Sequence, residues 1–156
     1  MNAHAGLPQR ILLADDDSVF CEAAATALSA AGFAVSVVSD GAEAISVLGS
    51  TDFDLAIVDL AMPRVDGFRL IALIRSTSSL IKLPIIVVTS SDKSEDAEEA
   101  HRLGANMFLI KPINWRLFPD IVRNVLDAKR SLADTEHDCR QPPKSWPGHS
   151  ATSRLN

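Results

Sequence analysis

The chain has 156 residues, 47% of them hydrophobic, which is enough for a single domain with a well-packed core. Its 15 Lys and Arg residues stand against 20 Asp and Glu residues, and the net charge of −5 with no basic patch argues against direct nucleic acid binding. The first ten residues lack the features of a signal peptide, and no apolar run approaches the roughly 18 residues of a membrane span. We therefore expect a cytoplasmic protein that does not enter a membrane.

The two cysteines, Cys21 and Cys139, lie far apart in the sequence. Their spacing fits neither a disulfide framework nor a zinc site. We expect both to be free thiols in a reducing compartment.

From Arg10 onward, short apolar runs alternate with longer segments of helical period. This pattern predicts a parallel sheet covered by helices on both faces. Strands are expected at residues 10–14, 33–38, 55–59, 84–89 and 106–110. Helices are expected at about 18–30, 41–49, 67–77, 93–103 and 114–130. The chain thus repeats a strand–helix unit five times.

Several helix ends carry recognisable signals. Gly32 and Gly104 follow the first and fourth helices, where a left-handed conformation favours glycine. Asp40 with Glu43 three residues later is typical of a capping box at the start of the second helix. Asp92 is the expected N-cap of the fourth helix.

The pattern changes after Arg130, where the chain becomes rich in proline and small polar residues without apolar periodicity. We therefore divide the chain into a flexible N-terminus at residues 1–9, one domain at 10–130, and a disordered tail at 131–156.

Unusual residues follow four of the expected strands. In an open parallel sheet, ligands bind at the carboxyl ends of the strands, so these residues should converge at one edge. They are Asp15, Asp16 and Asp17 after the first strand, Asp59 at the end of the third, Thr89 at the end of the fourth, and Lys111 and Pro112 after the fifth.

Each of these residues also has a purely structural interpretation. Asp17 fits a helix N-cap, and Asp59, Thr89 or Lys111 taken singly fits a turn, a strand end or a solvated charge. Neighbouring carboxylates at a crowded sheet edge repel one another, however, and that cost grows as water is excluded. Taken together, the residues favour one functional site.

The chemistry of such a site is constrained by its groups. Clustered carboxylates bind a hard cation such as Mg²⁺, which takes one or two protein carboxylates, waters and a phosphate oxygen. A metal and a lysine ammonium allow a phosphoryl group to approach despite the acids. Asp59 can then act as a nucleophile that forms an acyl phosphate, with Thr89 donating its hydroxyl to a phosphoryl oxygen and Lys111 supplying a cation.

The sequence resembles the receiver domain of bacterial two-component response regulators over about residues 10–128. The resemblance is carried by four stretches: LLADDD, IVDLAMPRVDG, IIVVTS and LIKP. It implies a flavodoxin-like (βα)5 fold, a doubly wound parallel sheet with strand order 2-1-3-4-5, the order also found in a chemotaxis receiver.

The resemblance also implies roles for individual residues. Asp59 would be the phosphoacceptor, Asp15 and Asp16 the acidic pair, with Asp16 the more direct Mg²⁺ ligand, and Ala61 would offer its backbone carbonyl to the metal. Thr89 would be the switch hydroxyl. Lys111 would be the lysine of the site, and its bond to Pro112 is expected to be cis.

Two features depart from or extend this pattern. Phe108 stands where many receivers have tyrosine, so its ring has no hydroxyl for a switch hydrogen bond. Ala61 and Ser91 flank the expected site, and we expect these small residues to influence how easily water attacks the phosphoryl group.

The implied partners are a sensor histidine kinase or a histidine phosphotransfer protein as phosphodonor, and a downstream protein. A homodimer through the fourth helix, fifth strand and fifth helix is one arrangement that the resemblance allows. The implied activity is phosphoacceptance, with at most self-phosphotransfer and autodephosphorylation, and not that of an enzyme. About 26 residues of tail are too few for an output domain, which favours a stand-alone receiver over a fragment of a longer protein.

Three alternatives belong to other classes. The stretch DDDSV also fits the start of haloacid-dehalogenase-like phosphatases, with Asp15 as nucleophile and Asp17 as acid or base. That family needs a further acidic pair downstream of the lysine, and it gives Asp59 no role. A dinucleotide-binding domain would need glycines where the chain has three aspartates. A pseudo-receiver that binds partners without phosphorylation would have no reason to keep every chemical group.

Overall fold

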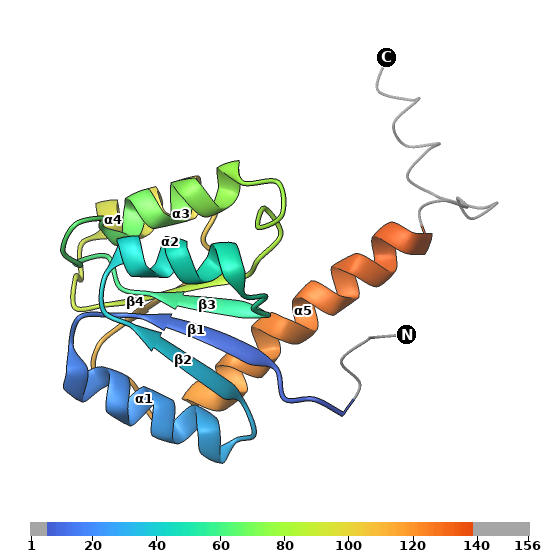
Figure 1. Cartoon of the computed structure of the whole chain (residues 1–156), viewed down its shortest axis with the longest axis horizontal. Helices are drawn as coiled ribbons and strands as arrows, with labels where there is room; N and C mark the ends of the chain where they lie inside the picture. Colours follow the sequence, from blue (N-terminus) through green and yellow to red (C-terminus); the bar gives the residue numbers. More distant parts are fainter. Residues whose placement is uncertain (1–5, 139–156) are drawn as a thin grey trace. The chain divides into compact units, whose positions relative to one another are not determined.

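The computed structural model describes residues 6–138, with side chains described through Leu132. Five strands form one parallel sheet in the order β2-β1-β3-β4-β5. This is the flavodoxin-like order predicted from the sequence. Figure 1 shows the sheet between its two layers of helices, and the strands are β1 (Arg10–Ala14), β2 (Ala34–Val38), β3 (Leu55–Val58), β4 (Ile85–Thr89) and β5 (Met107–Ile110).

In the part of the chain that the structure describes, five helices cover the sheet, with α2, α3 and α4 on one face and α1 and the first turns of α5 on the other (Figure 1). Among residues 6–138, none of these helices is both long enough and apolar enough to cross a membrane. The helices are α1 (Ser18–Ala30), α2 (Gly41–Ser50), α3 (Gly67–Ser76), α4 (Ser94–Leu103) and α5 (Phe118–Asp138).

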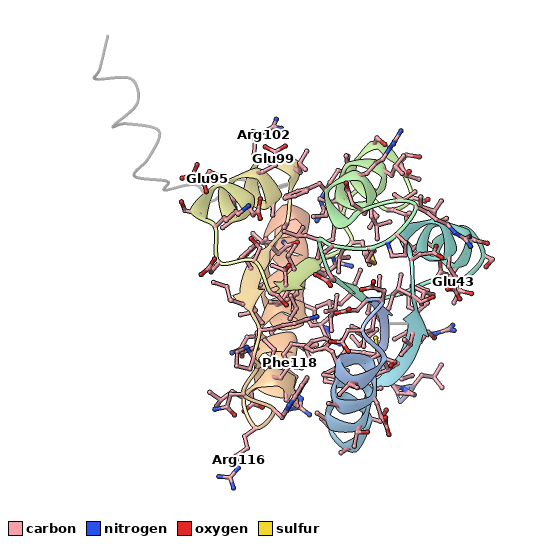
Figure 2. All side chains as sticks on the ribbon, turned by 90° about the vertical axis from the view of Figure 1, so that its left-hand side faces the viewer. Glu43, Glu95, Glu99, Arg102, Arg116 and Phe118 are labelled. Atoms are coloured by element: carbon pink, nitrogen blue, oxygen red, sulfur yellow. The ribbon has the colours of Figure 1, made fainter. Side chains whose placement is uncertain are left out.

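The sheet separates two hydrophobic cores, because successive residues of a strand face opposite sides. In β1, Leu12 and Ala14 belong to the core beneath α2, α3 and α4, whereas Ile11 and Leu13 belong to the core beneath α1 and α5. Figure 2 shows the fully buried Phe118 within the second core. Strands buried on both faces explain why the sequence shows continuous apolar runs.

Most of the predicted helix caps are present. The Asp17 side chain accepts hydrogen bonds from the backbone N–H groups of Val19 and Phe20, and the Asp40 side chain accepts from Glu43. Gly104 is the left-handed C-cap of α4 with φ of 112°. The prediction for Asp92 is wrong: α4 begins one residue later, so Lys93 occupies the N-cap position.

The boundaries of α5 also differ from the prediction. The backbone carbonyl of Asn114 accepts hydrogen bonds from the N–H groups of Leu117 and Phe118, which forms a tight turn, so the helix begins at Phe118 and not at residue 114. It continues past Arg130 to Asp138, because residues 131–138 contain no helix-breaking proline or glycine. The predicted disorder is therefore wrong for residues 131–138. Residues 1–5 and 139–156 of the predicted flexible ends, including Cys139, lie outside the described residues.

Arg75, near the end of α3, links that helix to the junction of α4 and β5. Its guanidinium donates to the Gly104 carbonyl from Nε at 3.0 Å and from Nη2 at 2.8 Å. It also donates to the Leu83 carbonyl at 2.7 Å and to Asn106 Oδ1 at 3.1 Å. The C-terminal end of α4 is therefore held by side-chain hydrogen bonds as well as by packing.

Candidate functional site

The strand register places the predicted acids side by side. Ala14 of β1 pairs with Val58 of β3, so Asp15 and Asp59 directly follow two paired residues. The backbone N–H of Asp59 donates to the Ala14 carbonyl at 2.9 Å, which extends the ladder by one residue. Both carboxylates therefore leave the sheet at its carboxyl edge, and both side chains are buried.

The same edge receives Thr89 and Lys111. Thr89 pairs with Ile110 at the end of β5, and the Lys111 N–H donates to the Thr89 carbonyl at 2.8 Å. The sequence expectation that these residues share one edge with the aspartates therefore agrees with the structure. The Lys111–Pro112 peptide bond is cis, as predicted.

The Lys111 ammonium lies between the two buried carboxylates. Its Nζ is 2.7 Å from Asp15 Oδ2 and 3.7 Å from Asp59 Oδ2, and 4.1 Å from the centroid of the Phe20 ring. Burial alone would lower the pKa of Lys111, but the hydrogen bond to Asp15 and the charges of Asp15 and Asp59 outweigh it and raise the pKa. Lys111 thus remains a cation that offsets the charge of the acids.

Asp15 is the most enclosed of the acids. Burial raises its pKa, and the nearby charge of Asp59 adds to that shift, although hydrogen bonds from Lys111 and from the Asp17 N–H at 2.9 Å oppose it. The Cys21 thiol donates to the Asp15 carbonyl at 3.3 Å, and burial next to these charges raises the pKa of Cys21 to about 11. Cys21 is a free thiol, as expected, and it contributes to packing.

Asp16 completes an acidic group with Asp15 and Asp59. One carboxylate oxygen from each of the three lies within 4.8 Å of the others, and Asp16 is exposed while its two partners are buried. Hard oxygen donors at this separation, open to water on one side, suit Mg²⁺, which keeps several waters when bound. The donor set therefore fits the metal predicted from the sequence.

A hollow of about 270 Å³ opens beside Asp59 at this edge. It lies between the loop after β3 and the loop after β4, and its small neighbours Ala61 and Ser91 leave it open. The Ala61 N–H donates to Asp59 Oδ1 at 3.4 Å, and the Ser91 N–H donates to Thr89 Oγ1 at 3.4 Å. The lining residues are Asp59, Leu60, Ala61, Phe68, Thr89, Ser90, Ser91 and Asp96.

Four lining residues were not singled out from the sequence: Leu60, Phe68, Ser90 and Asp96. Asp96 belongs to the acidic stretch SEDAEE, where nothing in the sequence separates it from its neighbours. Phe108, which was singled out, is partly buried and packs against the core beneath α2, α3 and α4.

The comparison with known families agrees with this geometry. The sequence model described as the response regulator receiver domain matches residues 11–123. The chain belongs to the response regulator receiver family. As a receiver domain, it contains the strand order, the acidic group and the lysine in the places that the sequence resemblance implied.

Relatives of this receiver domain include larger regulators. GltR, a transcriptional regulatory protein of Pseudomonas aeruginosa, is 42% identical over 106 residues, which cover 68% of this chain and 44% of GltR. The "Regulator of RpoS" of Escherichia coli is 32% identical over 105 residues, covering 67% of this chain and 31% of the regulator. The receiver domain spans about half the length, or less, of the curated relatives it matches.

Solved structures of receivers have the same fold. The chemotaxis response regulator CheY4 of Vibrio cholerae superimposes with a TM-score of 0.72 at 28% identity, covering 76% of this chain and 98% of CheY4. A response regulator of Chloroflexus aurantiacus gives a TM-score of 0.74 at 28% identity, covering 77% of this chain and 98% of that protein.

The phosphatase alternative gains no support from the family comparison or from the geometry. Asp15, its nucleophile, is bonded to Lys111 and to the Asp17 N–H, and the Asp17 carboxylate, its acid or base, accepts from the first turn of α1. Asp17 therefore has the capping role that the structural interpretation gave it.

Asp17→Ala distinguishes the helix-capping role of Asp17 from the acid or base role that the phosphatase alternative gives it. We expect the substitution to lower the free energy of unfolding by about 1 kcal/mol, the usual value of a lost N-cap, and to leave phosphorylation of Asp59 intact. Chemical denaturation measures the first effect, and intact-protein mass after incubation with a phosphodonor measures the second. Loss of all phosphoryl chemistry in a folded variant would contradict the capping role.

Proposed function

We propose that this receiver domain accepts a phosphoryl group on Asp59 and that phosphorylation changes which proteins the domain binds. The observation that carries the proposal is the position of Lys111 at the carboxyl edge of the sheet. Its Nζ lies 2.7 Å from Asp15 Oδ2 and 3.7 Å from Asp59 Oδ2. A cation shared by two buried carboxylates allows a dianionic group to approach one of them. In support, a solved relative, the cyanobacterial phytochrome response regulator RcpA, was crystallised phosphorylated.

In this mechanism an Asp59 oxygen attacks the phosphorus of the donor, and the bond between phosphorus and the donor's leaving atom breaks in line. Transition states of this kind are loose, so the protein contributes mainly by positioning and charge. Lys111 offsets the charge that gathers on the phosphoryl oxygens, and Thr89 turns its hydroxyl to one of them. The Ala61 N–H, already directed at Asp59 Oδ1, can move to a second oxygen.

Asp15, Asp16 and Asp59 would hold Mg²⁺, with the Ala61 carbonyl as a further ligand. The bound ion would supply additional positive charge at the phosphoryl oxygens. Asp16 is the exposed member of the group and would be the ligand nearest to solvent.

A histidine kinase or a histidine phosphotransfer protein would donate the phosphoryl group. The output would follow a population shift in which Thr89 moves inward and the surface of α4, β5 and α5 changes. That surface would bind a downstream protein or a second copy of the chain. The Phe108 ring on β5 would move with this surface, but it has no hydroxyl with which to form a new hydrogen bond.

The test is intact-protein mass after incubation with a small phosphodonor such as acetyl phosphate. We expect the wild type to gain one phosphoryl group only when Mg²⁺ is present. Asp59→Asn should abolish the gain, and Asp16→Asn should reduce it. Asp52→Asn, which removes an exposed acid from the loop before β3, is the control and should behave like the wild type. A gain that persists in Asp59→Asn would contradict the assignment of the phosphoacceptor.

A further inference from the structure

The hollow beside Asp59 has a second acid in its wall. Asp96 lies in the first turn of α4 and lines the hollow together with Asp59, Ala61 and Ser91. Of the described residues that line the hollow, Asp59 and Asp96 are the two carboxylates. Once Asp59 carries a phosphoryl group, Asp96 is therefore the remaining carboxylate in that wall.

Asp96 is held in place from the loop after β4. The Ser91 hydroxyl donates to Asp96 Oδ2, and the Lys93 N–H donates to the Ser91 oxygen at 3.4 Å. The hydroxyl that fixes Oδ2 leaves Oδ1 able to accept a hydrogen bond from water in the hollow. Because Ser91 also donates its N–H to Thr89 Oγ1 at 3.4 Å, one residue connects Asp96 to the phosphoryl-binding hydroxyl.

The hollow also provides the room that water needs. Its volume of about 270 Å³ exceeds the roughly 30 Å³ that one water occupies in the liquid. Ala61 offers only a methyl group and Ser91 only a hydroxymethyl group, so neither side chain fills it. A water molecule can thus stand on the side of a phosphorylated Asp59 that faces Asp96.

We propose that Asp96 positions and deprotonates the water that hydrolyses the Asp59 acyl phosphate, and so limits the lifetime of the signal. This inference rests on the proposed function. The water oxygen forms a bond to phosphorus while the bond between phosphorus and the Asp59 oxygen breaks. The electron pair of the broken bond stays on the Asp59 carboxylate. Asp96 Oδ1 takes one proton from the water and releases it to solvent, so the products are the free Asp59 carboxylate and inorganic phosphate.

Two nearby acids, Asp15 and Glu95, do not line the hollow and lack the position for this role. Asp15 is already bonded to Lys111 and the Asp17 N–H, and Glu95, next to Asp96 in the sequence, is exposed. Figure 2 shows Glu95 projecting from the outer side of α4. Glu95→Gln therefore removes the same charge from the same helical turn without changing the wall of the hollow.

The experiment follows the decay of phosphorylated protein by intact mass after the donor is removed. We expect Asp96→Asn to lose its phosphoryl group at least about tenfold more slowly than the wild type, because a positioned general base contributes about 10²-fold or more and a loose transition state reduces that benefit. Ser91→Ala should slow the decay by a smaller factor, because Asp96 keeps its carboxylate but loses its support. Glu95→Gln should decay at the wild-type rate.

The outcomes separate this inference from the proposed function. If the wild type gains no phosphoryl group on Asp59, both fail. If every protein is phosphorylated but Asp96→Asn decays as fast as the wild type or faster, the role of Asp96 is overturned while the phosphoacceptor stands. Equal slowing in Glu95→Gln and Asp96→Asn would also overturn it, because the effect would then come from the net charge of α4.

Discussion

Gly67→Ala should abolish phosphorylation of Asp59 and lower the free energy of unfolding by about 3 kcal/mol, the upper part of the usual range for overpacking. A Cβ atom at Gly67 would lie 2.3 Å from the Asp59 carbonyl oxygen and 2.6 Å from Leu60 Cα. Both neighbours are backbone atoms next to the candidate phosphoacceptor, so the clash cannot be relieved by rotating a side chain. The substitution must move either the start of α3 or Asp59 itself.

Gly49→Ala is the matched control for that substitution. Gly49 lies in α2, and apart from its chain neighbours and the nearby backbone of its own helix, no described atom stands within 4 Å of the position its Cβ would take. Alanine there should stabilise the protein by about 0.5–1 kcal/mol through helix propensity and leave phosphorylation unchanged. Denaturant unfolding and intact-protein mass measure both variants. Normal phosphorylation in Gly67→Ala would show that the close approach does not constrain the site.

Lys111→Met should cost both stability and phosphorylation. Asp15 and Asp59 would remain buried without their shared cation, and removing one partner of such a pair costs about 3 kcal/mol or more. The loss should be measured by denaturation at neutral pH in the presence of a chelator. Phosphorylation by a small donor should fall strongly, because the phosphoryl oxygens then lose the ammonium that offsets their charge beside Mg²⁺.

Two further measurements identify the cause of that instability. Burial raises the pKa of Asp15 in the folded protein, and without Lys111 the pKa should rise further. The folded variant then binds a proton that the unfolded chain has released, so its stability deficit should shrink as the pH falls toward the ordinary range of an aspartate. The double variant Asp15→Asn, Lys111→Met should recover stability but not phosphorylation. A deficit that does not change with pH would point to lost packing against Phe20.

The sequence predicted the fold well because its signals were redundant. The central strands β3 and β4 are apolar runs buried on both faces, and caps such as Asp17 and Asp40 bond to the helices they precede. The errors fall at helix ends. Asp92 was a plausible cap by residue type, but the loop before α4 places Lys93 in that position.

The candidate site was predictable where its residues follow strands, because a parallel sheet brings strand ends to one edge. Asp15, Asp59 and Lys111 were found in this way. Asp96 was not, because it enters the site from a helix, and only the three-dimensional path of the loop after β4 distinguishes it from nearby acids such as Glu95. The register of a sheet is encoded locally, whereas the direction of a loop depends on packing that is distant in the sequence.

The hydrogen bonds of Arg75 fix the C-terminal end of α4 more firmly than its N-terminal end is fixed. The Gly104 carbonyl is fixed by two bonds from Arg75, whereas among the described residues no side chain caps the helix at Lys93. The first turn of α4 is held by the Ser91–Asp96 side-chain hydrogen bond. A displacement that breaks this bond would tilt the helix about its C-terminal end and would not slide it along its axis. Side chains near Glu95 would travel farthest, and those near Gly104 would hardly move.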